Sequence, residues 1–108
     1  MTPKANTQKD ALTRAVYLEE LLLRQIDRLR SYDLDAAMAY AEQAEPVAAE
    51  VTAGGVLNLP QNADLKKRIE SLYRDLTLII ASQRQEVADK LEQIRDGIKT
   101  LSAYAGKR

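Results

Sequence analysis

The longest regular pattern in this chain is an amphipathic one that runs from about Asp64 to Tyr104. Apolar residues recur there in steps of three and four, the spacing that places side chains on one face of an α-helix. At a rise of ~1.5 Å per residue, a helix of this length is about 60 Å long. It cannot bury its apolar face alone, so the pattern predicts partner helices. The apolar positions are Leu65, Ile69, Leu72, Leu76, Ile80, Val87, Leu91, Ile94, Ile98 and Leu101.

The same periodicity predicts a first helix near residues 7–30, where Asn6 or Thr7 can serve as the N-cap. A turn over Ser31-Tyr32-Asp33 ends this helix. We expect its buried stripe to contain Leu12, Ala15, Val16, Leu22, Leu23, Ile26 and Leu29, widened by Leu18 and Leu21.

A second, alanine-rich helix is predicted near residues 34–52, capped by Asp33 or Asp35. Pro46 lies inside it, and because proline removes a helical hydrogen bond we expect a kink or a break there. Its expected inward residues are Leu34, Ala37, Met38, Ala41, Ala44, Ala48 and Val51.

The Gly54-Gly55 pair ends the second helix, since glycine tolerates the left-handed conformation that often closes one. The following loop is expected to pack Leu57 and Leu59 onto the bundle. Asn62 is then a good N-cap for the long helix, near residues 62–104.

These elements predict an all-α fold, an elongated antiparallel three-helix bundle formed by a single domain of residues 1–108. Each of the first two helices has roughly 20–25 residues, which is too short to cover a rod of about 60 Å. The C-terminal end of the long helix should therefore protrude beyond the other two.

The charge balance argues against nucleic acid as a partner. The formal net charge is zero, and the only basic run, Lys66-Lys67-Arg68, lies beside Asp64 and Glu70 without an aromatic platform, as on a solvated helix face. Residues 31–62 contain five acidic side chains and no Lys or Arg, between two mildly basic segments. Charge complementarity should therefore favour packing of the middle helix against its neighbours.

Catalytic chemistry is not visible in the sequence, so we expect no enzyme activity, no cofactor and no metal site. The chain has no His and no Cys. Asp33 and Asp35 sit at a helix start, where capping is their ordinary role. Gly54-Gly55 lacks the Lys-Ser/Thr of a phosphate loop. No apolar run is long enough for a membrane span, and the absence of Cys suits a cytoplasmic location.

The C-terminal part of the long amphipathic pattern is the candidate partner-binding site. It comprises Leu91, Ile94, Ile98, Leu101 and Tyr104. These residues are either bundle core or, where the shorter helices do not reach, an exposed apolar face that binds a partner helix.

Three segments, in order, resemble the FlgN-like family of flagellar type III export chaperones. The first is Leu18-Glu-Glu-Leu-Leu-Leu-Arg-Gln-Ile-Asp-Arg-Leu29, followed by the Tyr-Asp-Leu-Asp turn from Tyr32 to Asp35. A shorter Ala/Glu-rich helix comes next. The last is Ser82-Gln-Arg-Gln-Glu-Val-Ala-Asp-Lys-Leu-Glu-Gln-Ile-Arg-Asp-Gly97, ending in Leu101-Ser-Ala-Tyr104-Ala-Gly106.

This resemblance implies a cytoplasmic chaperone that binds the C-terminal helical segments of hook-associated proteins before export. It places the binding surface on Leu91, Ile94, Ile98, Leu101 and Tyr104. The export apparatus and a second copy of the chain are further candidate partners. The alternative is a structural helical bundle or adaptor that uses the same stripe to self-associate.

Overall fold

The computed structural model describes the backbone of residues 3–105 and the side chains of residues 9–101 and 103. It contains three α-helices: α1 (Pro3–Arg30), α2 (Leu34–Gly54) and α3 (Ala63–Ala105). Two short 3-10 turns, η1 (Val56–Asn58) and η2 (Pro60–Asn62), connect α2 to α3. No strand occurs between residues 3 and 105, so the predicted all-α class is confirmed.

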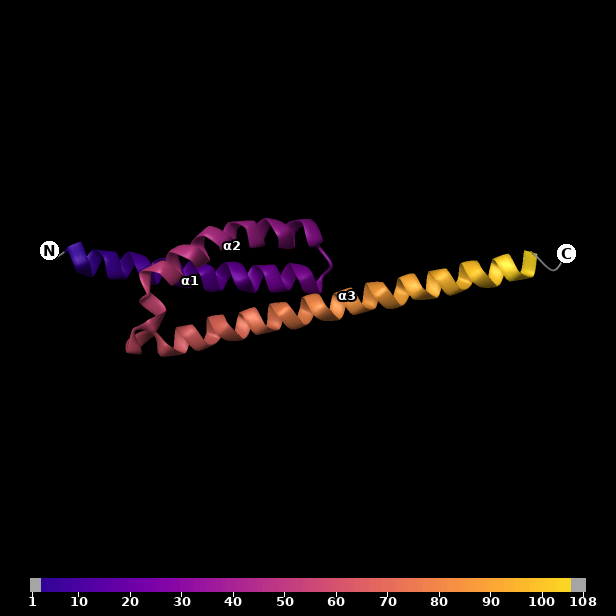
Figure 1. Ribbon diagram of the computed structural model, residues 1–108. Helices are drawn as coiled ribbons and strands as arrows, with labels where there is room; N and C mark the ends of the chain where they lie inside the picture. The colour runs from indigo at the N-terminus through magenta and orange to yellow at the C-terminus, as the bar shows by residue number, and fades with distance from the viewer. Residues whose placement is uncertain (1–2, 106–108) are drawn as a thin grey trace.

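Helices α1 and α3 run in the same direction and α2 runs in the opposite one, and α3 is much longer than the others (Figure 1). Both α2 and α3 pack on α1, whereas no Cα atom of α2 lies within 8 Å of a Cα atom of α3. The molecule measures 87 × 22 × 21 Å, because the C-terminal end of α3 extends beyond the other helices. The predicted elongated bundle with a protruding last helix is therefore confirmed.

The core lies where α1 meets α2, η1 and the first half of α3. Leu21 and Leu22 of α1 are each 1% exposed, the lowest values for large side chains. Leu57 and Leu59 pack against this core from the loop, as the sequence predicted. The buried apolar residues are Ala15, Leu18, Leu21, Leu22, Ile26, Leu29, Ala37, Ala44, Val47, Val51, Val56, Leu65, Ile69 and Leu76.

The predicted apolar stripe of α1 was wrong at Leu12, Val16 and Leu23, which are exposed. Steps of four and seven residues place these three on one face of the helix. The two neighbours of α1 cover a different face, with Leu18 and Leu21 near its centre rather than at its margin.

Helix α2 shows a similar difference from the prediction. Leu34 and Met38 lie near its start and are exposed, at 54% and 62%, whereas Val47 is buried. The helix continues unbroken through Pro46 and curves along its length in Figure 1, so a break there is ruled out. Pro46 is exposed, and so is Glu42, whose carbonyl loses its helical partner to the proline.

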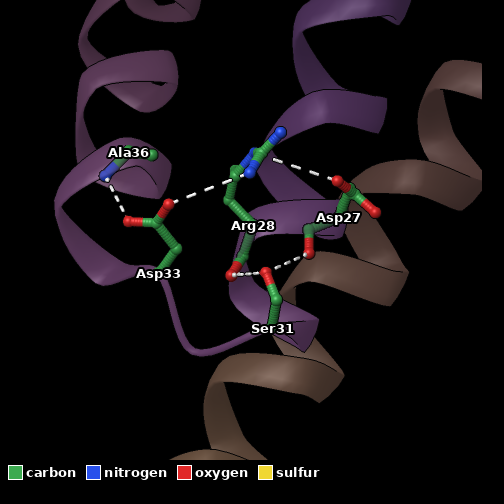
Figure 2. Close-up of polar contacts among 5 residues, drawn as sticks. All are labelled: Asp27, Arg28, Ser31, Asp33 and Ala36. Atoms are coloured by element: carbon green, nitrogen blue, oxygen red, sulfur yellow. Dashed lines mark hydrogen bonds and ion pairs between the residues drawn. The ribbon is translucent and has the colours of Figure 1, made fainter.

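Figure 2 shows the polar contacts that form the turn between α1 and α2. The Asp33 carboxylate accepts a hydrogen bond from the backbone N–H of Ala36 (3.2 Å), so Asp33 is the N-cap of α2. The same carboxylate lies 3.9 Å from the Arg28 guanidinium. The Ser31 hydroxyl donates to the carbonyls of Asp27 and Arg28, both at 3.1 Å, and so satisfies the last turn of α1.

The other helix ends follow the sequence in part. Gly55 adopts φ +67 and closes α2, as predicted. Helix α1 begins at Pro3 and not near residue 7, since proline is tolerated in a first turn; the side chains of the expected caps, Asn6 and Thr7, lie outside the described residues. Asn62 precedes α3, but its Nδ2 atom donates to the Val56 carbonyl (2.8 Å) and holds the loop instead.

Two cross-helix ion pairs join α1 to its neighbours, and the first of them matches the predicted charge complementarity of the middle helix. Arg14 of α1 lies 2.9 Å from Glu50 of the acidic α2. Arg68 of α3 lies 2.7 Å from Glu19 of α1, whose side chain is only 18% exposed. This carboxylate raises the pKa of Arg68 by its hydrogen bond and its charge. The first pair links α1 to α2, and the second links α1 to α3.

Candidate protein-binding surface

Helix α3 leaves the bundle at Gln83 and Glu86. The Gln83 side-chain amide donates a hydrogen bond to the carbonyl of Leu29, near the end of α1. One turn later, the Glu86 carboxylate accepts a hydrogen bond from the Tyr32 hydroxyl in the turn between α1 and α2. Beyond this point every described residue of α3 is exposed, so the rest of the helix has no neighbour within the chain.

The exposed part of α3 carries one continuous apolar row, which we call the distal stripe: Val87, Leu91, Ile94, Ile98 and Leu101. Four of these are predicted site residues, with exposed fractions of 55% for Leu91, 59% for Ile94 and Ile98, and 71% for Leu101. Tyr104, the fifth, lies in α3, but its side chain is outside the described residues. Of the two alternatives for this face, bundle core is therefore wrong for the single chain.

The polar side of this segment is electrically balanced. Residues 84–101 carry four basic and four acidic side chains. Local hydrogen bonds join Gln85 to Asp89 (2.9 Å) and the Thr100 hydroxyl to the Asp96 carbonyl (3.0 Å). A helix without tertiary contacts gains little from such bonds, because most helical stability in proteins comes from packing an apolar face. The distal stripe is therefore a surface that gains stability when covered.

A second apolar surface lies between α2 and α3. Because no Cα atoms of these two helices come within 8 Å of each other, they leave between them an open groove of about 410 Å³, which Leu22 of α1 also lines. We call it the α2–α3 groove. Burial raises the pKa of Tyr73 in its wall. The lining residues are Leu22, Gln25, Ala41, Ala44, Glu45, Ala48, Tyr73, Leu76, Thr77 and Ile80.

The sequence did not predict this groove. The signal that could have found it was the row of alanines in α2, of which Ala41, Ala44 and Ala48 were expected to face inward. Ala44 does pack closely on α1, but Ala41 and Ala48 are too small to reach α3, and the space between the helices stays open. Leu76 and Ile80, on the α3 wall, belong to the same apolar row as the distal stripe, so the two surfaces are continuous.

No cluster of three or more Asp, Glu, His or Cys side chains that could hold a metal ion occurs among the described residues. Asp33 is engaged in capping α2, as described above. Within residues 3–105, no helix combines the length and the apolar character needed to cross a bilayer. No protein family model, no curated protein and no solved structure matches this chain.

Proposed function

We propose that this chain is a non-enzymatic export chaperone of the FlgN-like type. It acts in the cytoplasm and binds the C-terminal helical segments of hook-associated proteins before their type III export. The observation that carries the proposal is the distal stripe, a row of large apolar side chains that are 55–71% exposed on an otherwise polar helix. Exposed apolar rows of this extent are typical of interaction sites.

The mode of binding follows from the shape of the surface. The distal stripe repeats in steps of three and four along a straight helix, which suits a partner helix laid along it. The bundle formed by α1, α2 and the first half of α3 acts as the base from which this helix projects. The order of the sequence segments that resemble the FlgN-like family supplies the class of partner.

The experiment compares two double variants of α3. Ile94→Asp with Ile98→Asp places two charges on the distal stripe, whereas Gln93→Asp with Thr100→Asp adds the same two charges to the polar face of the same turns. We expect the first variant to lose hook-associated proteins in a pull-down and the second to retain them. Truncating interface anchors typically costs about 2 kcal/mol or more each.

Both variants should remain folded and show a cooperative melt, because the substituted side chains are exposed in the single chain. An intact melt with unchanged binding would contradict the proposal. The structural or adaptor alternative would be favoured by two results together. The parent chain would bind no hook-associated protein, and the Ile94/Ile98 variant would lose an oligomer that the parent chain forms.

A further inference from the structure

We propose that two copies of this chain pair in antiparallel fashion through α3, so that Val87, Leu91 and Ile94 of the distal stripe of each copy enter the α2–α3 groove of the other. The result is a four-helix bundle at each end of the dimer, made of α1, α2 and α3 of one copy and the distal part of α3 of its partner. This inference goes beyond the proposed function, since self-pairing requires no export substrate. The second copy covers the same distal stripe, so the two partners compete for it.

The lengths of the two surfaces match. Residues 63–83 of α3 belong to the bundle and residues 84–105 extend from it, which divides the 43-residue helix into halves of 21 and 22 residues. A two-fold axis near the Gln83–Arg84 bond would therefore lay each distal half along the packed half of the partner helix. Such an interface is isologous and closed, so it ends at the dimer.

The spacing of apolar residues is symmetric about the same bond. Steps of four, three and four join Ile69, Tyr73, Leu76 and Ile80 on one side, and the same steps join Val87, Leu91, Ile94 and Ile98 on the other. An antiparallel pair with its axis at Gln83–Arg84 therefore aligns every member of one set with a member of the other. The aligned pairs are Ile80 with Val87, Leu76 with Leu91, Tyr73 with Ile94, and Ile69 with Ile98.

The antiparallel direction also follows from what each half of α3 carries. The apolar face of the packed half is already covered by α1, with Ile69 and Leu76 buried, so this half cannot enter a groove with that face. The distal half is a bare helix and fits. In a parallel pair, packed half would meet packed half and the two distal stripes would leave both grooves open.

Charge at the groove rim is complementary in this register. Helix α2 contains no Lys or Arg, and Glu45 lies on the rim of the α2–α3 groove beside Ala44. The alignment of Leu91 with Leu76 brings the neighbouring Lys90 to this part of the groove. A lysine near an acidic rim favours this partner over one with acidic side chains there.

The pairing covers apolar surface on both copies. Each copy contributes the five exposed apolar side chains of the distal stripe. In this register Val87, Leu91 and Ile94 lie at the level of the partner's α2–α3 groove.

Light scattering after size exclusion tests the pairing. We expect the full chain to have twice the 12.1 kDa mass of one copy, and the Ile94→Asp/Ile98→Asp variant to have the mass of one. The control Gln93→Asp/Thr100→Asp, with both changes on the polar face, should remain a dimer. A parent chain that keeps a mass of 12.1 kDa when its concentration is raised ~100-fold would overturn the inference.

Single introduced cysteines test the register by disulfide cross-linking. The chain has no cysteine of its own, so any cross-link comes from the introduced residue. Arg84→Cys lies at the two-fold axis, so oxidation should link two copies. Gln93 is also exposed, but its counterpart in the partner lies about 28 Å away along the helix axis, at ~1.5 Å per residue. Equal cross-linking of the two variants would overturn the antiparallel register.

A groove variant separates this inference from the proposed function. Thr77 is exposed and lines the α2–α3 groove, outside the distal stripe. Thr77→Arg should give a folded monomer, because it places a cation beside Lys90 of the incoming helix, and should still retain hook-associated proteins. A Thr77→Arg chain that remains fully dimeric would overturn the groove as the docking site. A dimeric parent chain that binds no hook-associated protein would instead contradict only the proposed function.

Discussion

The Tyr32 hydroxyl donates a hydrogen bond to the Glu86 carboxylate, across 54 positions of sequence. The bond joins the turn between α1 and α2 to the side of α3, at the level where α3 leaves the bundle. Gln83, one turn earlier, donates to the Leu29 carbonyl. These two contacts mark the boundary between the part of α3 that belongs to the fold and the part that is free to bind.

The Tyr32–Glu86 bond predicts a measurable shift in a tyrosine titration. The hydrogen bond to Glu86, and then its charge, raise the pKa of Tyr32 above the ordinary value of 10.0. Since the folded pKa is above the unfolded one, the bond stabilises the fold below about pH 10, and this contribution is lost as pH rises through the folded pKa.

We therefore expect Glu86→Gln to lower the pKa of Tyr32 toward its ordinary value, measured from phenolate absorbance against pH. Tyr32→Phe identifies the signal, because it removes one phenol and leaves the other tyrosines unchanged. An absorbance curve for Glu86→Gln that superimposes on that of the parent chain would mean that the contact is absent in solution.

Tyr32 also has an unusual backbone conformation, with φ 59. Its N–H donates to the Leu29 carbonyl and the N–H of Asp33 donates to the Arg28 carbonyl, the Schellman arrangement that glycine normally completes. Tyr32→Ala and Tyr32→Gly both remove the contact with Glu86, but only glycine relieves the left-handed strain. We expect the glycine variant to melt at a higher temperature than the alanine variant. Equal melting temperatures would show that the strain has no cost.

Leu22 and Leu23 are adjacent in α1 but face different surroundings, at 1% and 52% exposure. Leu22→Ala should destabilise the fold by about 2–5 kcal/mol, since it opens a cavity in the core. Leu23→Ala should change stability by no more than about 0.5 kcal/mol, because its side chain is already half in water. Urea unfolding of both variants measures the difference, and a large loss for Leu23→Ala would place a further contact on that face.

Substitution of glycine by alanine should have opposite effects on stability at Gly55 and at Gly97. Gly55 has φ +67, so Gly55→Ala should cost about 1–2 kcal/mol through the backbone, although an added Cβ would meet only Asn58 at 4.0 Å. Gly97 lies within α3 with nothing within 4 Å of an added Cβ, so Gly97→Ala should favour the helix by up to about 1 kcal/mol. Thermal melts test the first, and amide hydrogen exchange along residues 84–101 tests the second.

The helices and their ends were largely predictable from the sequence, because local chemistry decides them. Asp33 caps α2 through the next turn of its own backbone, and Gly55 closes that helix through its own φ angle. The apolar spacing of residues 65–101 likewise predicted one long helix, longer than its neighbours could cover. Such features depend on residues within a few positions of one another, so a single sequence contains them.

The tertiary structure decided which part of each apolar face is covered. Leu76 and Leu91 belong to the same row of α3, yet one is 5% exposed and the other 55%, because α1 ends near Gln83. Leu12, Val16 and Leu23 are apolar but exposed, since both neighbours of α1 pack on another of its faces. Periodicity shows that a helix has an apolar side. Burial depends on where the other helices lie and where they end, and only the tertiary structure gives those positions.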